Sequence, residues 1–267
     1  MPCIFCAREF TKSNPDTVEH VLKRSWMKAL GHANTPMPGQ LFRGESIVRE
    51  IPASRPAMEL VVGKICQFCN GGWMEQVDSS VGEELLSLAR AETKLGNLSS
   101  DARFRFARWA LKTACVLRHS SPKNYRHVPT GIMASCHLPD YLPRGFIAFA
   151  HQLAPGTKGL NASSMDSWIR HNGRIGAVSL TPQSQRLKAA FQFDSLVVGC
   201  SWVASHGVPC FKVYPGIHEV LLVRDARVNA YSPWDQLAVG DVISSTPNVT
   251  HALQFSLNCD IEPFIAA

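Results

Sequence analysis

The sequence predicts an α+β protein with three successive parts: a cysteine-framed module over residues 1–80, a helical bridge over 81–120 and a β-rich domain over 121–267. Two C-x-x-C pairs bracket the first part. Apolar residues then recur at helical spacing, and the last part holds β-branched and aromatic runs interrupted by Gly, Pro, Asn and Ser. A chain of 267 residues is long enough for one large domain or two modest ones.

The first element is a frame of four cysteines. Cys3 and Cys6 form one C-x-x-C pair, and Cys66 and Cys69 form a second pair about sixty residues later. Four thiolates from two such knuckles make a closed tetrahedral site, which suits a structural zinc ion. Buried thiols without a metal are the alternative, but the phenylalanine inside each pair favours zinc. The segment between the two pairs is longer than in a simple zinc ribbon, so we expect it to carry additional functional residues.

Composition narrows the class of protein. The formal net charge of +6 and the sequence pI of about 8.9 permit a polyanionic partner without establishing one. The chain has no uninterrupted apolar run of the roughly 20 residues that a membrane helix needs, and its first residues do not read as a signal peptide. We therefore expect a cytoplasmic protein without a membrane partner, whose nine cysteines are reduced or metal-bound.

The segment between the knuckles carries Glu19-His20-Val21, and the second knuckle continues as CNGGWMEQVD. With the two C-x-x-C pairs, these motifs make residues 1–80 resemble the HNH endonucleases. The most similar group is one of bacterial and phage HNH proteins whose second knuckle reads C-N-x-G-W-M-x-x-[LIV]-[DE]. The resemblance extends weakly into FARWALKTACVL. It implies a ββα-metal module that hydrolyses phosphodiester bonds, with DNA as the favoured substrate.

The resemblance assigns a role to each motif residue. His20 matches the general base that takes a proton from water, a task that suits a near-neutral imidazole. Glu19 and Asn70 match the ligands of a catalytic divalent ion, Mg²⁺ or Mn²⁺. Because the knuckle fixes the backbone just before it, Asn70 is expected to lie opposite His20. Lys23 and Arg24 follow the motif and are expected to contact nucleic acid.

Two alternatives to an active nuclease remain open. The family carries an asparagine shortly before the second knuckle, and this chain reads AMELVVGKI there. Its absence favours a catalytically inactive, zinc-stabilised nucleic-acid-binding protein, whereas the presence of Glu19, His20 and Asn70 favours an active enzyme. The third possibility is a nuclease effector gated by a C-terminal sensor domain.

Two acids follow the second knuckle. Glu75 and Asp78 are three residues apart, so a helix would place them on one face. Asp78 matches the acid that ends the family pattern. It could belong to the metal shell, pair with a basic side chain or cap the next helix, and a structural role is favoured.

The bridge is predicted to contain helices over 79–94 and 99–119. Ser80 and Glu83 have the spacing of a capping box, and Ser99 or Ser100 is expected to open the second helix. In that helix, apolar residues at helical spacing are expected to face the core, namely Phe104, Ala107, Leu111, Ala114 and Leu117.

A basic stripe accompanies this apolar face. Arg105, Arg108 and Lys112 recur at i, i+3 and i+7 and would suit the phosphates of DNA. A solvated helix face is the alternative for the same pattern.

Overall fold

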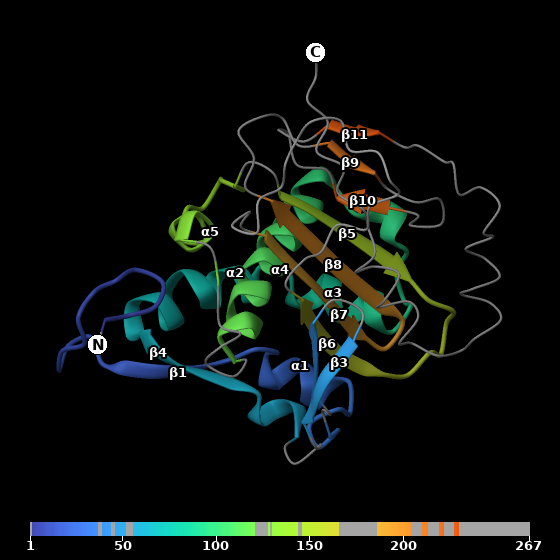
Figure 1. The fold of residues 1–267 in the computed structure, drawn as a ribbon. Helices are drawn as coiled ribbons and strands as arrows, with labels where there is room; N and C mark the ends of the chain where they lie inside the picture. The colour runs from blue at the N-terminus through green and yellow to red at the C-terminus, as the bar shows by residue number, and fades with distance from the viewer. Residues whose placement is uncertain are drawn as a thin grey trace.

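A computed structural model describes residues 2–36, 39–43, 46–51, 56–120, 128, 130–143, 146–165, 186–203, 210–212, 219–221 and 227–229. These residues form both helices and strands, which confirms the predicted α+β class (Figure 1). The expected domain boundary near residue 121 and the stretch 230–267 lie outside the described residues.

The N-terminal module is built on an antiparallel pair of strands. β1 (Asp16–His20) pairs with β4 (Val61–Cys66), and the two lie side by side in Figure 1. The segment between them holds a helix, a 3-10 turn and a second antiparallel pair of strands, which are α1 (Arg24–Ala29), η1 (Ala57–Glu59), β2 (Gly39–Arg43) and β3 (Ser46–Ile51).

An irregularity changes the register of the first pair. Thr17 lies opposite Ile65, whereas Glu19 lies opposite Val62, so β4 has one residue more than β1 in this stretch. Lys64 within it has a φ of 65°, a left-handed conformation that is uncommon outside glycine. Such a bulge bends and twists the strands, and here the bend falls beside Glu19.

A helical segment follows β4 and completes a strand–strand–helix order. η2 (Cys69–Met74) is interrupted at Gly72, whose φ of −101° and ψ of −109° are not helical, and α2 (Glu75–Ser79) continues from it. Met74 and Val77 are buried. The second knuckle is thereby joined directly to a helix that packs on the core.

The two bridge helices form near their predicted positions. α3 (Gly82–Ala89) is followed by the 3-10 turn η3 (Leu95–Asn97) and by α4 (Ser100–Ser120). The Ser99 hydroxyl accepts a hydrogen bond from the Ala102 amide, so Ser99 caps α4. The capping box predicted for α3 is wrong, because the Ser80 hydroxyl instead donates to the Val77 carbonyl of the preceding helix.

The described residues beyond α4 form mainly strands. A five-stranded antiparallel sheet has the order β10-β5-β8-β7-β6. A short parallel pair, β9 with β11, and the helix α5 accompany it. Their bounds are α5 (Thr130–Ser135), β5 (Phe146–Gln152), β6 (Leu160–Met165), β7 (Arg186–Phe193), β8 (Leu196–Val203), β9 (Cys210–Lys212), β10 (Glu219–Leu221) and β11 (Arg227–Asn229).

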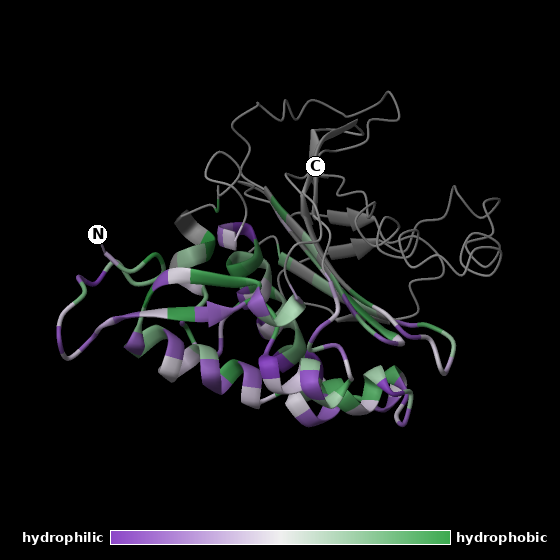
Figure 2. Cartoon of the chain, turned by 90° about the horizontal axis from the view of Figure 1, so that it is seen from below, coloured by the Kyte–Doolittle hydropathy of each residue, from purple (hydrophilic) through white to green (hydrophobic). Residues whose placement is uncertain are grey.

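α4 is a shared core helix between the module and the sheet. It contacts β4 and α2 of the module as well as β5 to β8 of the sheet. Every residue from Trp109 to Arg118 is buried, and the Trp109 ring packs 5.5 Å from that of Phe191. The described helices in Figure 2 carry both hydrophilic and hydrophobic residues, as helices with one solvated face do.

Because α4 is covered on two sides, Lys112 is buried and not exposed as the sequence predicted. The sequence predicted one core face and one exposed basic face on this helix. The exposed position expected for Lys112 is wrong, because its side chain is 1% exposed. The sheet covers one side of α4 and the N-terminal module covers the other.

Candidate functional site

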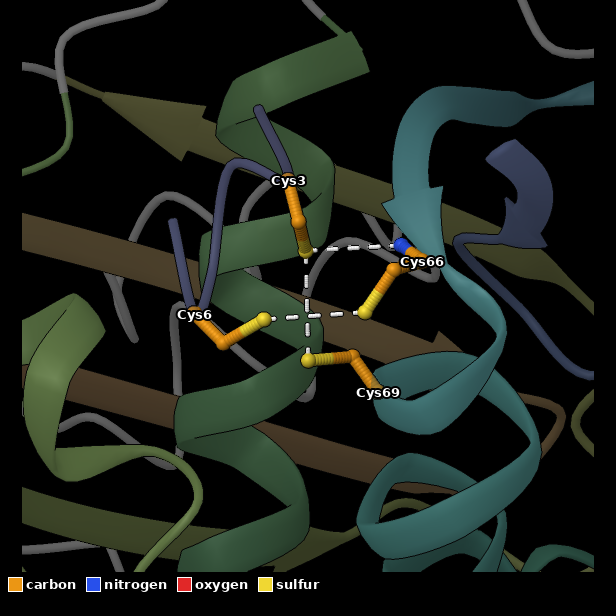
Figure 3. Close-up of side chains that lie close together, drawn as sticks. All are labelled: Cys3, Cys6, Cys66 and Cys69. Carbon is orange, nitrogen blue, oxygen red and sulfur yellow. Dashed lines mark hydrogen bonds between the residues drawn. The ribbon is translucent and has the colours of Figure 1, made fainter. Parts of the chain in front are cut away.

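Four cysteines from two segments converge on one point. Figure 3 shows Cys3 and Cys6 from the N-terminal turn, facing Cys66 at the end of β4 and Cys69 at the start of η2. All four sulfur atoms lie within 4.8 Å of one another, with Cys3 Sγ 3.9 Å from Cys69 Sγ and Cys6 Sγ 3.6 Å from Cys66 Sγ. Zinc–sulfur bonds of about 2.3 Å in a tetrahedron give a separation of about 3.8 Å. The predicted cysteine cluster is therefore placed to hold a metal ion such as zinc.

The clustered thiols shift one another's pKa values. The side-chain contact with Cys69 lowers the pKa of Cys3 to about 4, while the same contact and burial raise the pKa of Cys69. Burial also raises the pKa of Cys6. A bound divalent cation would stabilise the thiolate forms of these side chains.

A buried donor beside the cluster fits a metal–thiolate centre. The indole Nε1 of Trp73 is buried and has no conventional hydrogen-bond partner among the described residues. It lies next to Cys69, and its N–H lowers the pKa of that thiol against the larger effects of Cys3 and burial. N–H donors to coordinating sulfurs orient and stabilise metal ligands. The Trp73 ring also packs edge-on against Phe5 at 5.6 Å, which fixes its position.

Asn70 connects the second knuckle to β1. Its Nδ2 donates to Thr17 Oγ1 and to the Val18 carbonyl, each at 3.0 Å. A carbonyl oxygen can only accept, so the nitrogen of the amide must face β1. No described residue donates to Asn70 Oδ1, which leaves that oxygen as the ligand-capable atom of the side chain.

Glu19 is held by a lysine of α4. Its carboxylate Oε1 lies 2.6 Å from Lys112 Nζ, and the same ammonium lies 2.9 Å from both oxygens of Asp78. Burial raises the pKa of Glu19, and pairing with Lys112 offsets this only in part. Of the three roles considered for Asp78, the structure shows pairing with a basic side chain.

His20 ends β1 and is half-buried. Burial lowers its pKa, and the positive charges of Arg24 and Lys112 lower it further. Its imidazole is therefore predominantly neutral at neutral pH, the form in which it can accept a proton. Among the described residues, the four cysteines are the only group of three or more His, Cys, Asp or Glu side chains placed to hold a metal ion, so Glu19 and His20 do not form a second such group.

The predicted nucleic-acid-binding residues lie in different surroundings. Lys23 pairs with Glu75 at 2.6 Å, and Arg24 is exposed. Arg105 pairs with Glu84 at 2.8 Å and also donates to the Ser80 carbonyl. Arg108 is half-buried, and its pKa is lowered by burial. With Lys112 buried, the three basic residues of α4 do not form an open row of cations.

Sequence reasoning missed the link between Lys112 and the two carboxylates. The available signal was a lysine within WALKTACVL, an otherwise uncharged and largely apolar run. A charge in such a run is expected to be paired if the run is buried on all sides.

Comparison of this chain with known proteins finds no similar protein. The chain matches no protein-family model, and neither a curated protein nor a solved structure is significantly similar to it. Within the described ranges, no helix is both long and apolar enough to cross a membrane.

Proposed function

We propose that this protein is a metal-dependent endonuclease that hydrolyses phosphodiester bonds, with DNA as its favoured substrate. The observation that carries the proposal is the contact of Asn70 with β1. Through it, the residue that follows the second knuckle is bonded to the strand that ends in His20. The motif residues Glu19, His20 and Asn70 are thus joined in one strand–strand–helix module.

Structural zinc is the first part of the proposal. Cys3, Cys6, Cys66 and Cys69 would hold one Zn²⁺, and the spacing of their sulfurs and the buried N–H of Trp73 beside Cys69 support this. Elemental analysis of protein purified without chelator is expected to give one zinc per chain. Cys66→Ser is expected to lose the ion and unfold the module, because zinc binding to small fingers contributes on the order of 10–16 kcal/mol.

His20 is proposed as the general base. Its lowered pKa keeps the imidazole neutral near pH 7, so that it can accept a proton from the attacking water. Its position at the end of β1, opposite Val61, leaves it half-buried and not enclosed.

A divalent cation, Mg²⁺ or Mn²⁺, would supply charge stabilisation at the scissile phosphate and the leaving oxygen. Asn70 Oδ1 and the second oxygen of Glu19 would hold it, since neither accepts a hydrogen bond from a described residue. Two protein ligands are sufficient, because Mg²⁺ usually keeps several waters and shares substrate phosphates.

The test is incubation of the purified full chain with supercoiled plasmid and with structured RNA, each with Mg²⁺, Mn²⁺ or excess chelator. The wild type is expected to nick or linearise DNA only with a divalent ion. His20→Ala is expected to lose this activity, and His137→Ala, which removes an exposed histidine outside the module, is expected to keep it. Absence of cleavage of either substrate with both ions would contradict the proposal.

A specific observation favours the second candidate, a nucleic-acid-binding protein without catalytic activity. Lys112 occupies one oxygen of Glu19, the residue that the family resemblance assigns to the metal. If that ion pair excludes a cation, the zinc-stabilised module would bind nucleic acid and leave it intact. Binding without cleavage in the same experiment would support this function.

A further inference from the structure

Lys112 lies at the centre of a buried cluster of charges. Its ammonium contacts Glu19 Oε1 at 2.6 Å and both carboxylate oxygens of Asp78 at 2.9 Å. A lysine has three N–H donors, so these contacts use its full hydrogen-bonding capacity. The cluster joins β1, α2 and α4, three elements that are distant in the sequence.

Stability alone does not account for a lysine at this position. Lys112 sits between buried neighbours in α4 and is 1% exposed. Desolvation of an ammonium and two carboxylates is costly, and apolar replacement of such clusters is often neutral or stabilising. Burial works against the charged lysine, but Asp78 and Glu19 outweigh it and raise its pKa, so the ammonium remains charged.

The two carboxylates are held in different ways. Both oxygens of Asp78 face the ammonium, whereas Glu19 meets it only through Oε1. No donor among the described residues contacts Glu19 Oε2. Asp78 therefore anchors the lysine, and Glu19 keeps one oxygen for another partner.

We propose that Lys112 is a positioning residue of the endonuclease site: anchored on Asp78, it holds the Glu19 carboxylate with Oε2 available to a divalent cation. This inference rests on the proposed function, because it assigns a role within the same site. Since α4 also packs on the five-stranded sheet, the lysine links the geometry of the site to that sheet.

A double-mutant cycle on Mn²⁺ binding tests the proposal. The zinc-loaded full chain is titrated with Mn²⁺, and the free ion is measured by electron paramagnetic resonance. Lys112→Met is expected to raise the Mn²⁺ dissociation constant about 10–100-fold, the usual effect of losing a residue that orients a ligand. Adding Lys112→Met to Glu19→Gln is expected to cause no further loss, because Lys112 acts through Glu19.

Two further variants separate positioning from folding. Thr113→Val is the matched control, since it alters the adjacent buried residue of α4, whose hydroxyl has no partner among the described residues. It is expected to bind Mn²⁺ as the wild type does. If Lys112→Met fails to fold, Lys112→Arg is measured in its place, because it keeps a cation against both carboxylates. Its larger planar head is expected to displace Glu19 and to weaken Mn²⁺ binding in the same direction.

The outcomes distinguish this inference from the proposed function. If the Lys112 variants fold and bind Mn²⁺ like the wild type, the lysine is only a structural ion pair and the inference is overturned, even if the wild type cleaves DNA. Equal losses from Lys112→Met in the wild-type and Glu19→Gln backgrounds would also overturn it. A wild type that binds Mn²⁺ but cuts no nucleic acid would overturn the endonuclease while the cycle still decides the role of Lys112. A wild type that binds no Mn²⁺ would overturn both.

Discussion

The side-chain amide of Asn70 donates to the backbone carbonyl of Val18 at 3.0 Å, two residues before His20. A second hydrogen bond, to Thr17 Oγ1, has the same length. The cysteine knuckle therefore fixes the start of the helix and, through one side chain, also the strand that carries the proposed general base.

Removal of this contact should affect both stability and the metal site. We expect Asn70→Ala to lower the free energy of unfolding by about 1–3 kcal/mol, because two hydrogen bonds contribute roughly 0.5–1.5 kcal/mol each. The Mg²⁺ concentration for half-maximal cleavage should rise, since a ligand is lost while the base remains. Urea denaturation and metal titration measure the two effects. Asn97→Ala, at an exposed position, should change neither, and an Asn70→Ala variant as stable as the wild type would show that the contact is not formed in solution.

Trp73→Phe tests the role of the indole N–H at the cysteine cluster. Phenylalanine keeps the packing against Phe5 but removes the donor next to Cys69. We expect zinc affinity to fall about 10–100-fold, as is typical for the loss of an outer-shell partner, when it is measured by competition with a chromogenic chelator. Trp26→Phe removes a different buried indole, packed on Trp109, and should leave zinc affinity unchanged. Equal affinity in Trp73→Phe and wild type would argue against an N–H···S bond.

Asp194 should give the stability of the protein a specific pH dependence. It lies in the turn between β7 and β8 and accepts hydrogen bonds from His32 Nε2 at 2.7 Å, Lys158 Nζ at 2.9 Å and the Gly159 amide at 3.1 Å. Burial would raise its pKa, but these three donors outweigh burial and lower it below the ordinary value of 3.8. The folded state is therefore favoured above that pH, and the contribution is lost as the pH falls below 3.8 toward the lowered pKa.

Asp194→Asn is the variant that isolates this effect. It should lower the free energy of unfolding by about 1.5–3 kcal/mol at pH 7, the range for hydrogen bonds to a charged group. The difference from the wild type should shrink below pH 3.8, where the wild-type carboxylate becomes protonated. Asp140→Asn, at an exposed position, serves as the control. A difference that stays constant down to the lowest pH at which both proteins fold would contradict this origin.

The sequence predicted well what local spacing determines. The cysteine cluster follows from two C-x-x-C pairs, and α4 follows from helical periodicity and the Ser99 cap. The sequence wrongly predicted an exposed position for Lys112. Helical periodicity describes a single helix, and it does not describe the sheet and the N-terminal module that cover this helix. The partners of Glu19 and Asp78 depend on the same packing, and contacts between β1, α2 and α4 leave no trace in sequence spacing.

The exposed Arg24 offers a test of nucleic-acid binding. If its guanidinium contacts a phosphate, Arg24→Ala should reduce the slope of log affinity against log salt by roughly one unit for every DNA sequence. Lys94→Ala removes an exposed lysine near η3 and should leave the slope unchanged. Fluorescence anisotropy with two unrelated duplexes over a range of salt concentrations measures both. An unchanged slope in Arg24→Ala would remove this residue from the binding surface.

The rate of DNA cleavage by His20→Ala under single-turnover conditions tests the central claim most directly. Wild type and variant would be compared at saturating enzyme and Mn²⁺, after zinc content and DNA affinity have been shown to be equal. Loss of a general base should slow cleavage at least about 10²-fold while binding is retained. Cleavage by His20→Ala at the wild-type rate would contradict the assignment of His20 and, with it, the proposed active site.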